Sequence, residues 1–255
     1  MTSVPVSVMA ADVEHESLWV ILKIISAKTK ALAVCEDFLE MRGIYRSGLL
    51  GKGAAGMMDL HDPGNSARKR WLILTKGVGF APAVNLIRWT AGRIDIHVIA
   101  DPEKVGDDVI RRQFRAWQPE AFRNEGGRFR LEFQSLAKLL EQPAAASPLQ
   151  QTDSTAPAPP ATALHTSGSH DPDLNAPCLQ QTDYDRIFLL ASDYYIKRLS
   201  AVMKIPPEKL VFCNNFHLCC GEGICGACGH VDAEGNLRKM CKCREFSALD
   251  LLLPE

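Results

Sequence analysis

The spacing of cysteines near the C-terminus limits the fold of this chain more than any other feature. Four cysteines follow the pattern Cys220-x4-Cys225-x2-Cys228-x12-Cys241. This is the plant-type ferredoxin spacing, in which a tight loop carries three thiolates and a later residue supplies the fourth. The residues between these cysteines are mostly small, as they must be where a backbone wraps an inorganic cluster and turns its amides toward the sulfurs. The spacing predicts a [2Fe-2S] cluster held by these four cysteines.

A zinc site is the competing interpretation of the same segment. Cys225, Cys228, Cys241 and Cys243 would also supply four thiolates for tetrahedral zinc. Zinc would leave Cys220 without a role, whereas the iron-sulfur pattern leaves Cys243 as the spare residue. The iron-sulfur pattern accounts for the segment better, and zinc stays open as the alternative.

The remaining cysteines carry no comparable pattern. Cys219 is adjacent to Cys220, but only Cys220 gives the four-residue gap. Cys213 is expected to be an ordinary buried thiol at the end of a strand, and Cys35 and Cys178 stand alone in the sequence. Clustered cysteines in a chain without a secretory signal indicate metal binding rather than disulfides.

Strand and helix patterns alternate upstream of the cysteines. The apolar run Trp71–Thr75 is typical of a buried parallel strand, and a glycine turn over Lys76–Pro82 follows it at once. A helical pattern covers Ala83–Trp89. Further strands are predicted at Ile94–Ile99, Phe129–Phe133, Arg186–Ala191 and Leu210–Phe212, and further helices at Asp107–Trp117 and Tyr194–Met203. Repeated units of this kind predict an α/β fold with a parallel sheet covered by helices.

One long segment breaks this alternation. Residues Gln142–Asp183 contain no Lys or Arg and are dominated by Ala, Pro, Ser, Thr and Gln. Such a composition buries too little apolar surface to offset the entropy lost on ordering. We expect a disordered insert in an otherwise compact α/β domain.

Composition and charge exclude several classes of function. The chain has 255 residues, 46% of them hydrophobic, and a formal net charge of -1. That charge gives no pull toward nucleic acid or an anionic membrane. No apolar run approaches the roughly 20 residues of a spanning helix, and the N-terminus has no basic signal region, so we expect a cytoplasmic protein. His97 lies within a predicted strand and is interpreted as structural.

The order of these motifs resembles a known family. A glycine turn followed by the C-terminal cysteine loop is similar to the electron-transfer subunit of dihydroorotate dehydrogenase, in the ferredoxin reductase superfamily. Three segments carry the resemblance: Arg42–Gly48, Gly77–Pro82 and Cys220–Cys241. It implies a flavin-binding β-barrel, a Rossmann-like NAD(P) domain and a [2Fe-2S] module that passes electrons between FAD and a partner oxidoreductase.

The resemblance also implies cofactor contacts and domain bounds. The implied contacts are Lys23, Thr29, Ser47 and Gly48 with FAD, and Gly77, Gly79 and Pro82 with NAD(P)H. The expected domains are a partial flavin-domain-like β region at 1–50, the nucleotide-binding-like α/β domain at 51–141 and 184–215, the insert at 142–183, and the iron-sulfur module at 216–255.

This sequence departs from the family pattern at three places. Few residues precede Arg42, so Leu18–Thr29 resembles only the last strands of the barrel. Leu190–Ser192 replaces the family's Cys-Gly-Pro, and Lys76 replaces a glycine. We therefore expect weak FAD binding and no NAD(P)H oxidation by the isolated chain, unless a second copy completes the flavin site. The expected function is electron transfer to or from a partner oxidoreductase, and the alternative is a zinc-stabilised binding scaffold.

Overall fold

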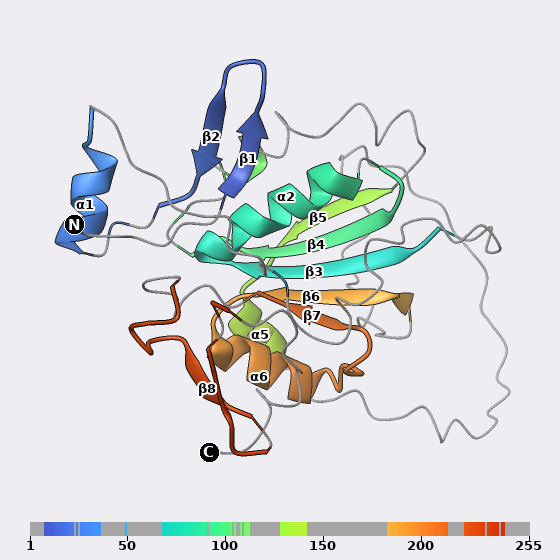
Figure 1. Cartoon of the computed structure of the whole chain (residues 1–255). Helices are drawn as coiled ribbons and strands as arrows, with labels where there is room; N and C mark the ends of the chain where they lie inside the picture. The colour runs from blue at the N-terminus through green and yellow to red at the C-terminus, as the bar shows by residue number, and fades with distance from the viewer. Residues whose placement is uncertain are drawn as a thin grey trace, which may run out of the picture.

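A five-stranded parallel sheet forms the centre of the structure. The structure is a computed structural model, and it describes residues 8–22, 24, 26–36, 49, 68–90, 92–103, 105, 108, 110–112, 128–141, 183–213, 222–232, 234–239 and 241–242. The strand order is β5-β4-β3-β6-β7 (Figure 1). The strands are β3 (Arg70–Lys76), β4 (Asp95–Asp101), β5 (Phe129–Phe133), β6 (Arg186–Leu190) and β7 (Leu210–Phe212). The chain runs outward from β3 to β5 and then returns to place β6 beside β3. The strand order therefore reverses between β3 and β6, at the carboxyl ends of these two strands.

Both faces of the sheet are apolar because helices cover each of them. On β3, Trp71 and Ile73 belong to one buried cluster, whereas Leu72 and Leu74 belong to the other. Successive residues of a strand point to opposite faces, so a continuous apolar run is what a doubly covered parallel strand requires. The predicted α/β class with a parallel sheet is confirmed.

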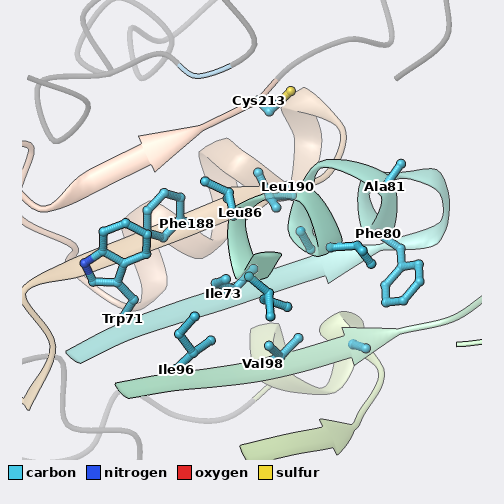
Figure 2. Packing of buried hydrophobic residues seen from close by; sticks show 14 of the residues in the cluster. Trp71, Ile73, Phe80, Ala81, Leu86, Ile96, Val98, Phe188, Leu190 and Cys213 are labelled. Atoms are coloured by element: carbon cyan, nitrogen blue, oxygen red, sulfur yellow. The ribbon is translucent and has the colours of Figure 1, made fainter. Parts of the chain in front are cut away.

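Helix α2 (Phe80–Thr90) covers the first face, directly after the short 3-10 helix η2 (Gly77–Gly79). Its buried side chains pack with Trp71 and Phe188, whose ring centroids lie 4.7 Å apart (Figure 2). Cys213 follows β7 at the edge of the same cluster and is buried, as expected. This face holds most of the large aromatic side chains of the core.

Helices α5 (Leu136–Glu141) and α6 (Asp193–Val202) cover the second face (Figure 1). Leu139, Ile196 and Leu199 are buried against the apolar residues of the strands. The sequence patterns did not predict α5. With only six residues, this helix is too short to show a clear helical period.

An N-terminal hairpin packs beside α2. It consists of β1 (Val8–Asp12) and β2 (Ser17–Val20), which pair antiparallel. Met9 reaches the cluster beneath α2, and the guanidinium of Arg88 lies 3.5 Å from the carbonyl oxygen of Ala11. Within the described part of residues 1–50, β1 and β2 are the strands that correspond to the β region expected there.

The expectation of strands as far as Thr29 is wrong. Thr29 lies in the first turn of α1 (Ala27–Ala33), where Ser26 and Thr29 form a reciprocal capping box. The hydroxyl of Ser26 accepts from the amide of Thr29 at 3.3 Å, and the amide of Ser26 donates to the Thr29 hydroxyl at 3.0 Å. This capping arrangement starts a helix and stops the strand pattern.

The other expected elements agree with the structure where it describes them. β5 and β7 have the predicted bounds, and β3, β4, β6, α2 and α6 differ from their predictions by a few residues at their ends. For the helix expected at Asp107–Trp117, the structure describes Asp108 and residues 110–112 as helical. The insert at 142–183 lies outside the described residues apart from Asp183. Among the helices described, none is long and apolar enough to cross a membrane.

Candidate cysteine loop and glycine turn

A small C-terminal hairpin brings together cysteines that are distant in the sequence. Strand β8 (Gly229–Val231) pairs antiparallel with β9 (Leu237–Lys239), and Gly229 lies opposite Lys239. Cys228 immediately precedes β8, and Cys241 follows β9 by two residues. Both cysteines therefore lie at the open end of the hairpin, and both are buried.

Glycines shape the loop that leads into this hairpin. Gly223 and Gly226 have positive φ angles of 75° and 72°, a region that side chains with a Cβ rarely adopt. The amide of Gly229 donates to the carbonyl of Gly226 at 2.9 Å and closes a turn around Cys228. The ammonium of Lys239 donates to the carbonyl of Gly223 at 2.5 Å, which ties the loop to β9. Cys225, between the two glycines, is exposed.

Asp232 organises the other end of the hairpin. Its carboxylate accepts from the amide of Asn236 at 2.8 Å, the amide of Glu234 at 3.1 Å and the guanidinium of Arg238 at 2.8 Å. The hydrogen bond from Arg238 makes the largest contribution to lowering the pKa of Asp232 below its ordinary value, despite partial desolvation. An ionised aspartate thus fixes the turn that sets the register of the two strands.

The hairpin lies against the α5 and α6 side of the sheet (Figure 1). Cys228 and Cys241 belong to the same buried cluster as the apolar residues of these helices, and Tyr195 of α6 packs against that cluster. The imidazole of His230 lies 3.9 Å from the carboxylate of Asp193, at the start of α6. These contacts fix the open end of the hairpin close to the N-terminus of α6.

The predicted ligand set is described in part. Cys225, Cys228 and Cys241 lie on the loop and hairpin, whereas Cys220 and the alternative ligand Cys243 fall outside the described residues. In the described ranges, no three His, Cys, Asp or Glu side chains converge closely enough to hold a metal ion. The donor type is that of a thiolate-bound metal, because Cys228 and Cys241 both lie at the open end of the hairpin and Cys225 lies on the glycine-shaped loop that precedes it.

The glycine turn lies where the strand order reverses. Gly77 has a φ of 53°. A Cβ on Gly79 would lie 1.9 Å from the carbonyl oxygen of Leu190, so the turn packs directly on the end of β6. Thr75, next to this contact, is 1% exposed and its hydroxyl has no hydrogen-bond partner within the described structure. Gly79 is therefore required for close packing between the turn and β6.

Lys76 spans the carboxyl ends of β3 and β4. Its ammonium lies 2.6 Å from the carboxylate of Asp101 and 3.2 Å from that of Glu103. It also lies 5.0 Å from the ring centroid of Tyr195, at cation-π distance. We name these four residues the Lys76 network. It joins the glycine turn, the end of β4 and the start of α6.

The two carboxylates of the Lys76 network stabilise the charged form of Lys76. Burial lowers the pKa of Lys76, but the hydrogen bonds and charges of Asp101 and Glu103 outweigh burial, so the pKa is raised above its ordinary value. Lys76 therefore stays charged at neutral pH. A partly buried lysine facing two carboxylates stabilises them, and its removal would leave them close together without compensation.

A second polar cluster lies on the side of the sheet covered by α5 and α6. Nδ1 of His97 lies 2.7 Å from the hydroxyl of Tyr184, and Nε2 lies 3.1 Å from the carboxylate of Glu132 without hydrogen-bond alignment. Burial lowers the pKa of His97, the carboxylate of Glu132 opposes that shift, and the guanidiniums of Arg130 and Arg70 add to it. His97 is thus a buried neutral histidine, in keeping with the structural role predicted for it.

The expected flavin and nucleotide residues are distributed unevenly. Lys23, Ser47 and Gly48 lie outside the described residues, and Thr29 lies in α1. The three residues expected to contact NAD(P)H are placed together, because Gly77 and Gly79 form η2 and Pro82 lies in the first turn of α2.

The predictions from the sequence did not include three residues of the Lys76 network: Asp101, Glu103 and Tyr195. A signal for Asp101 was present, since an acidic residue about 20 positions after a glycine turn is part of the dinucleotide-binding fingerprint. Nothing in the sequence pattern points to Glu103 or Tyr195.

Comparison with known proteins adds no assignment. No protein-family model matches the chain, and no curated protein matches it at a significant level.

Proposed function

We propose that this chain is an electron-transfer subunit that carries a [2Fe-2S] cluster on Cys220, Cys225, Cys228 and Cys241. It would relay electrons between a flavin or NAD(P)H and a partner oxidoreductase, as its resemblance to dihydroorotate dehydrogenase electron-transfer subunits implies. The observation that carries the proposal is the hairpin, which brings Cys228 and Cys241 to one end beside the loop of Cys225. Bound to four thiolates, a [2Fe-2S] cluster accepts and donates single electrons.

Burial divides the described cysteines into two kinds, and this division suits such a role. Cys228 and Cys241 are buried in apolar surroundings, which would shield their side of the site from water. Cys225 is exposed, and the neighbouring Ile224 is 83% exposed. Electron transfer requires one edge of the site to be open to a partner, and the Cys225 side offers that edge.

The experiment is to purify the protein without oxygen and measure its iron, acid-labile sulfide, zinc and visible absorption. The proposal requires two irons and two sulfides per chain and a red-brown protein. Cys225→Ser and Cys220→Ser should each lose the chromophore, whereas Cys213→Ser, which changes a buried thiol that does not belong to the spacing pattern, should retain it. A colourless protein with one zinc, retained in Cys220→Ser and lost in Cys243→Ser, would replace the proposal with the zinc-stabilised scaffold.

Flavin content tests the electron source separately. The described N-terminal strands are β1 and β2, and a tight flavin site needs walls that cover the isoalloxazine. We therefore expect the isolated chain to release little FAD on denaturation and to show no NADH-dependent reduction of ferricyanide. Stoichiometric FAD with turnover would mean that the chain, alone or as an oligomer, completes its own flavin site.

A further inference from the structure

The Lys76 network occupies the region where a parallel sheet of this strand order would receive a dinucleotide. In such sheets a nucleotide binds outside the carboxyl ends of the strands, where the strand order reverses. Its pyrophosphate lies over the glycine turn, and an acid at the end of the second strand accepts from the ribose hydroxyls. Here Gly77 is the turn, and Asp101 ends β4, the second strand in chain order of the sheet.

Asp101 is already committed to partners within the protein. One carboxylate oxygen lies 2.6 Å from the ammonium of Lys76 and accepts from the amide of Leu136 at 2.9 Å. The other accepts from the amide of Glu103 at 3.3 Å. Asp101 is only 6% exposed. A ribose hydroxyl would have to displace Lys76 to reach this carboxylate.

Glu103 covers the glycine turn itself. One of its carboxylate oxygens lies 2.8 Å from the position that a Cβ would take on Gly77. Its backbone has a φ of 50°, which is strained for a residue other than glycine. A pyrophosphate over this turn would meet a negative charge at contact distance, where like charges repel strongly.

We propose that the Lys76 network is a built-in occupant of the dinucleotide position, so that the intact network keeps NADH off the glycine turn, removal of Glu103 alone weakens this block, and removal of both Lys76 and Glu103 weakens it most. The ammonium satisfies the acid that would otherwise accept from the ribose, and the carboxylate of Glu103 lies where the pyrophosphate would lie. This inference goes beyond the proposed function, because it concerns the sheet and holds whether the cysteines bind iron or zinc. Under the proposed electron-transfer function, the wild-type chain then takes its electrons from a partner rather than from NADH bound at this turn.

The test is a calorimetric NADH titration of the full chain, wild type against Lys76→Gly, Glu103→Gly and the double variant. The wild type should show no saturable binding at millimolar NADH. The double variant should bind at least about tenfold more tightly. Discrimination against NADPH is expected as well, since the released carboxylate of Asp101 repels a 2′-phosphate.

Two controls keep the result decisive. Lys138→Met removes an exposed lysine of α5 and should leave NADH binding as in the wild type. Glu103 has a positive φ, which glycine adopts without strain, so Glu103→Gly is expected to fold. This single variant should strengthen NADH binding even if Lys76→Gly does not fold. Micromolar NADH binding by the wild type, or a folded Glu103→Gly chain that binds no better than wild type, would overturn the proposal. Iron and sulfide content should be the same in all variants, which separates this result from the proposed function.

Discussion

The parallel sheet and the cysteine hairpin are held together in different ways. In the sheet, side chains such as Phe188 and Leu189 on opposite faces are both fully buried. In the hairpin, Val231 and Leu237, which lie opposite each other, are 60% and 64% exposed. Apolar burial stabilises the sheet, whereas the hairpin depends on the Asp232 turn, the glycine loop and its buried cysteines.

This difference explains where a metal would matter. A two-stranded hairpin of three residues per strand is marginal in water without further support. Metal binding to thiolates couples to local folding, because the site does not exist in the unfolded chain. The sheet needs no such support. We therefore expect cysteine substitutions to destabilise mainly the hairpin and core substitutions to destabilise mainly the sheet.

The largest expected effect is on the cysteine side. Cys225→Ser should abolish the visible absorption and the bound iron, and hydrogen exchange at the amides of β8 and β9 should become much faster. Exchange within β3 and β6 should stay slow, since their protection comes from the apolar core. Cys35→Ser changes an exposed cysteine of the N-terminal region and serves as the control. Loss of protection in the sheet as well would show that the two regions fold as one unit.

The sheet could be predicted from the sequence because its strands are continuous apolar runs. Such runs are needed when both faces of a parallel strand are covered, and the glycine turn marks the end of β3. Thr29 was placed wrongly because its capping contact with Ser26 involves two hydroxyl residues rather than the usual acidic partner. Helix α5 was missed because of its length.

The candidate sites could be predicted from the sequence only where the spacing of residues along the chain identifies them. Cysteine spacing gives the expected ligands, and Cys228 and Cys241 do lie at one end of a hairpin. The Lys76 network is formed by residues from the end of β3, the end of β4, the segment after β4 and the start of α6. Lys76 and Asp101 meet because β3 and β4 pair in parallel with these two residues opposite each other, and residue spacing along one segment does not show which residue of another strand lies opposite.

The next largest effect is expected from the core of the sheet. Phe188→Ala removes a fully buried ring that packs on Trp71, and such truncations cost about 3–5 kcal/mol of unfolding free energy. Urea denaturation followed by far-ultraviolet circular dichroism measures this loss. Tyr194→Ala removes an exposed aromatic ring on α6 and is the matched control. An iron content that falls in proportion to stability would weaken the distinction between the two regions.

A smaller effect is expected at the glycine turn. Gly79→Ala would place a methyl group 1.9 Å from the carbonyl oxygen of Leu190, so η2 and β6 must move apart. Overpacking of this kind costs about 1–3 kcal/mol. Gly235→Ala is the comparison. A Cβ at Gly235 meets nothing within 4 Å, so any loss of stability in this variant comes only from the backbone strain of a φ of 83°. A Gly79→Ala chain as stable as the wild type would show that close contact with β6 adds nothing.

The smallest effect is a pH dependence that belongs to the sheet alone. Burial lowers the pKa of His97 below its ordinary value of 6.5, against the pull of Glu132 and with the help of Arg130 and Arg70. The folded state therefore binds fewer protons than the unfolded state, and the stability that His97 contributes is present above its unfolded pKa and is lost as the pH falls below it. One proton limits this loss to about 1.4 kcal/mol per pH unit.

Urea denaturation at pH 7.5 and pH 5.5 measures this dependence. His97→Gln keeps a side chain able to hydrogen-bond with Tyr184 but removes the titrating group, so its unfolding free energy should fall less than that of the wild type over this range. If His97→Gln and wild type lose equal stability on acidification, His97 is not the source of the pH dependence.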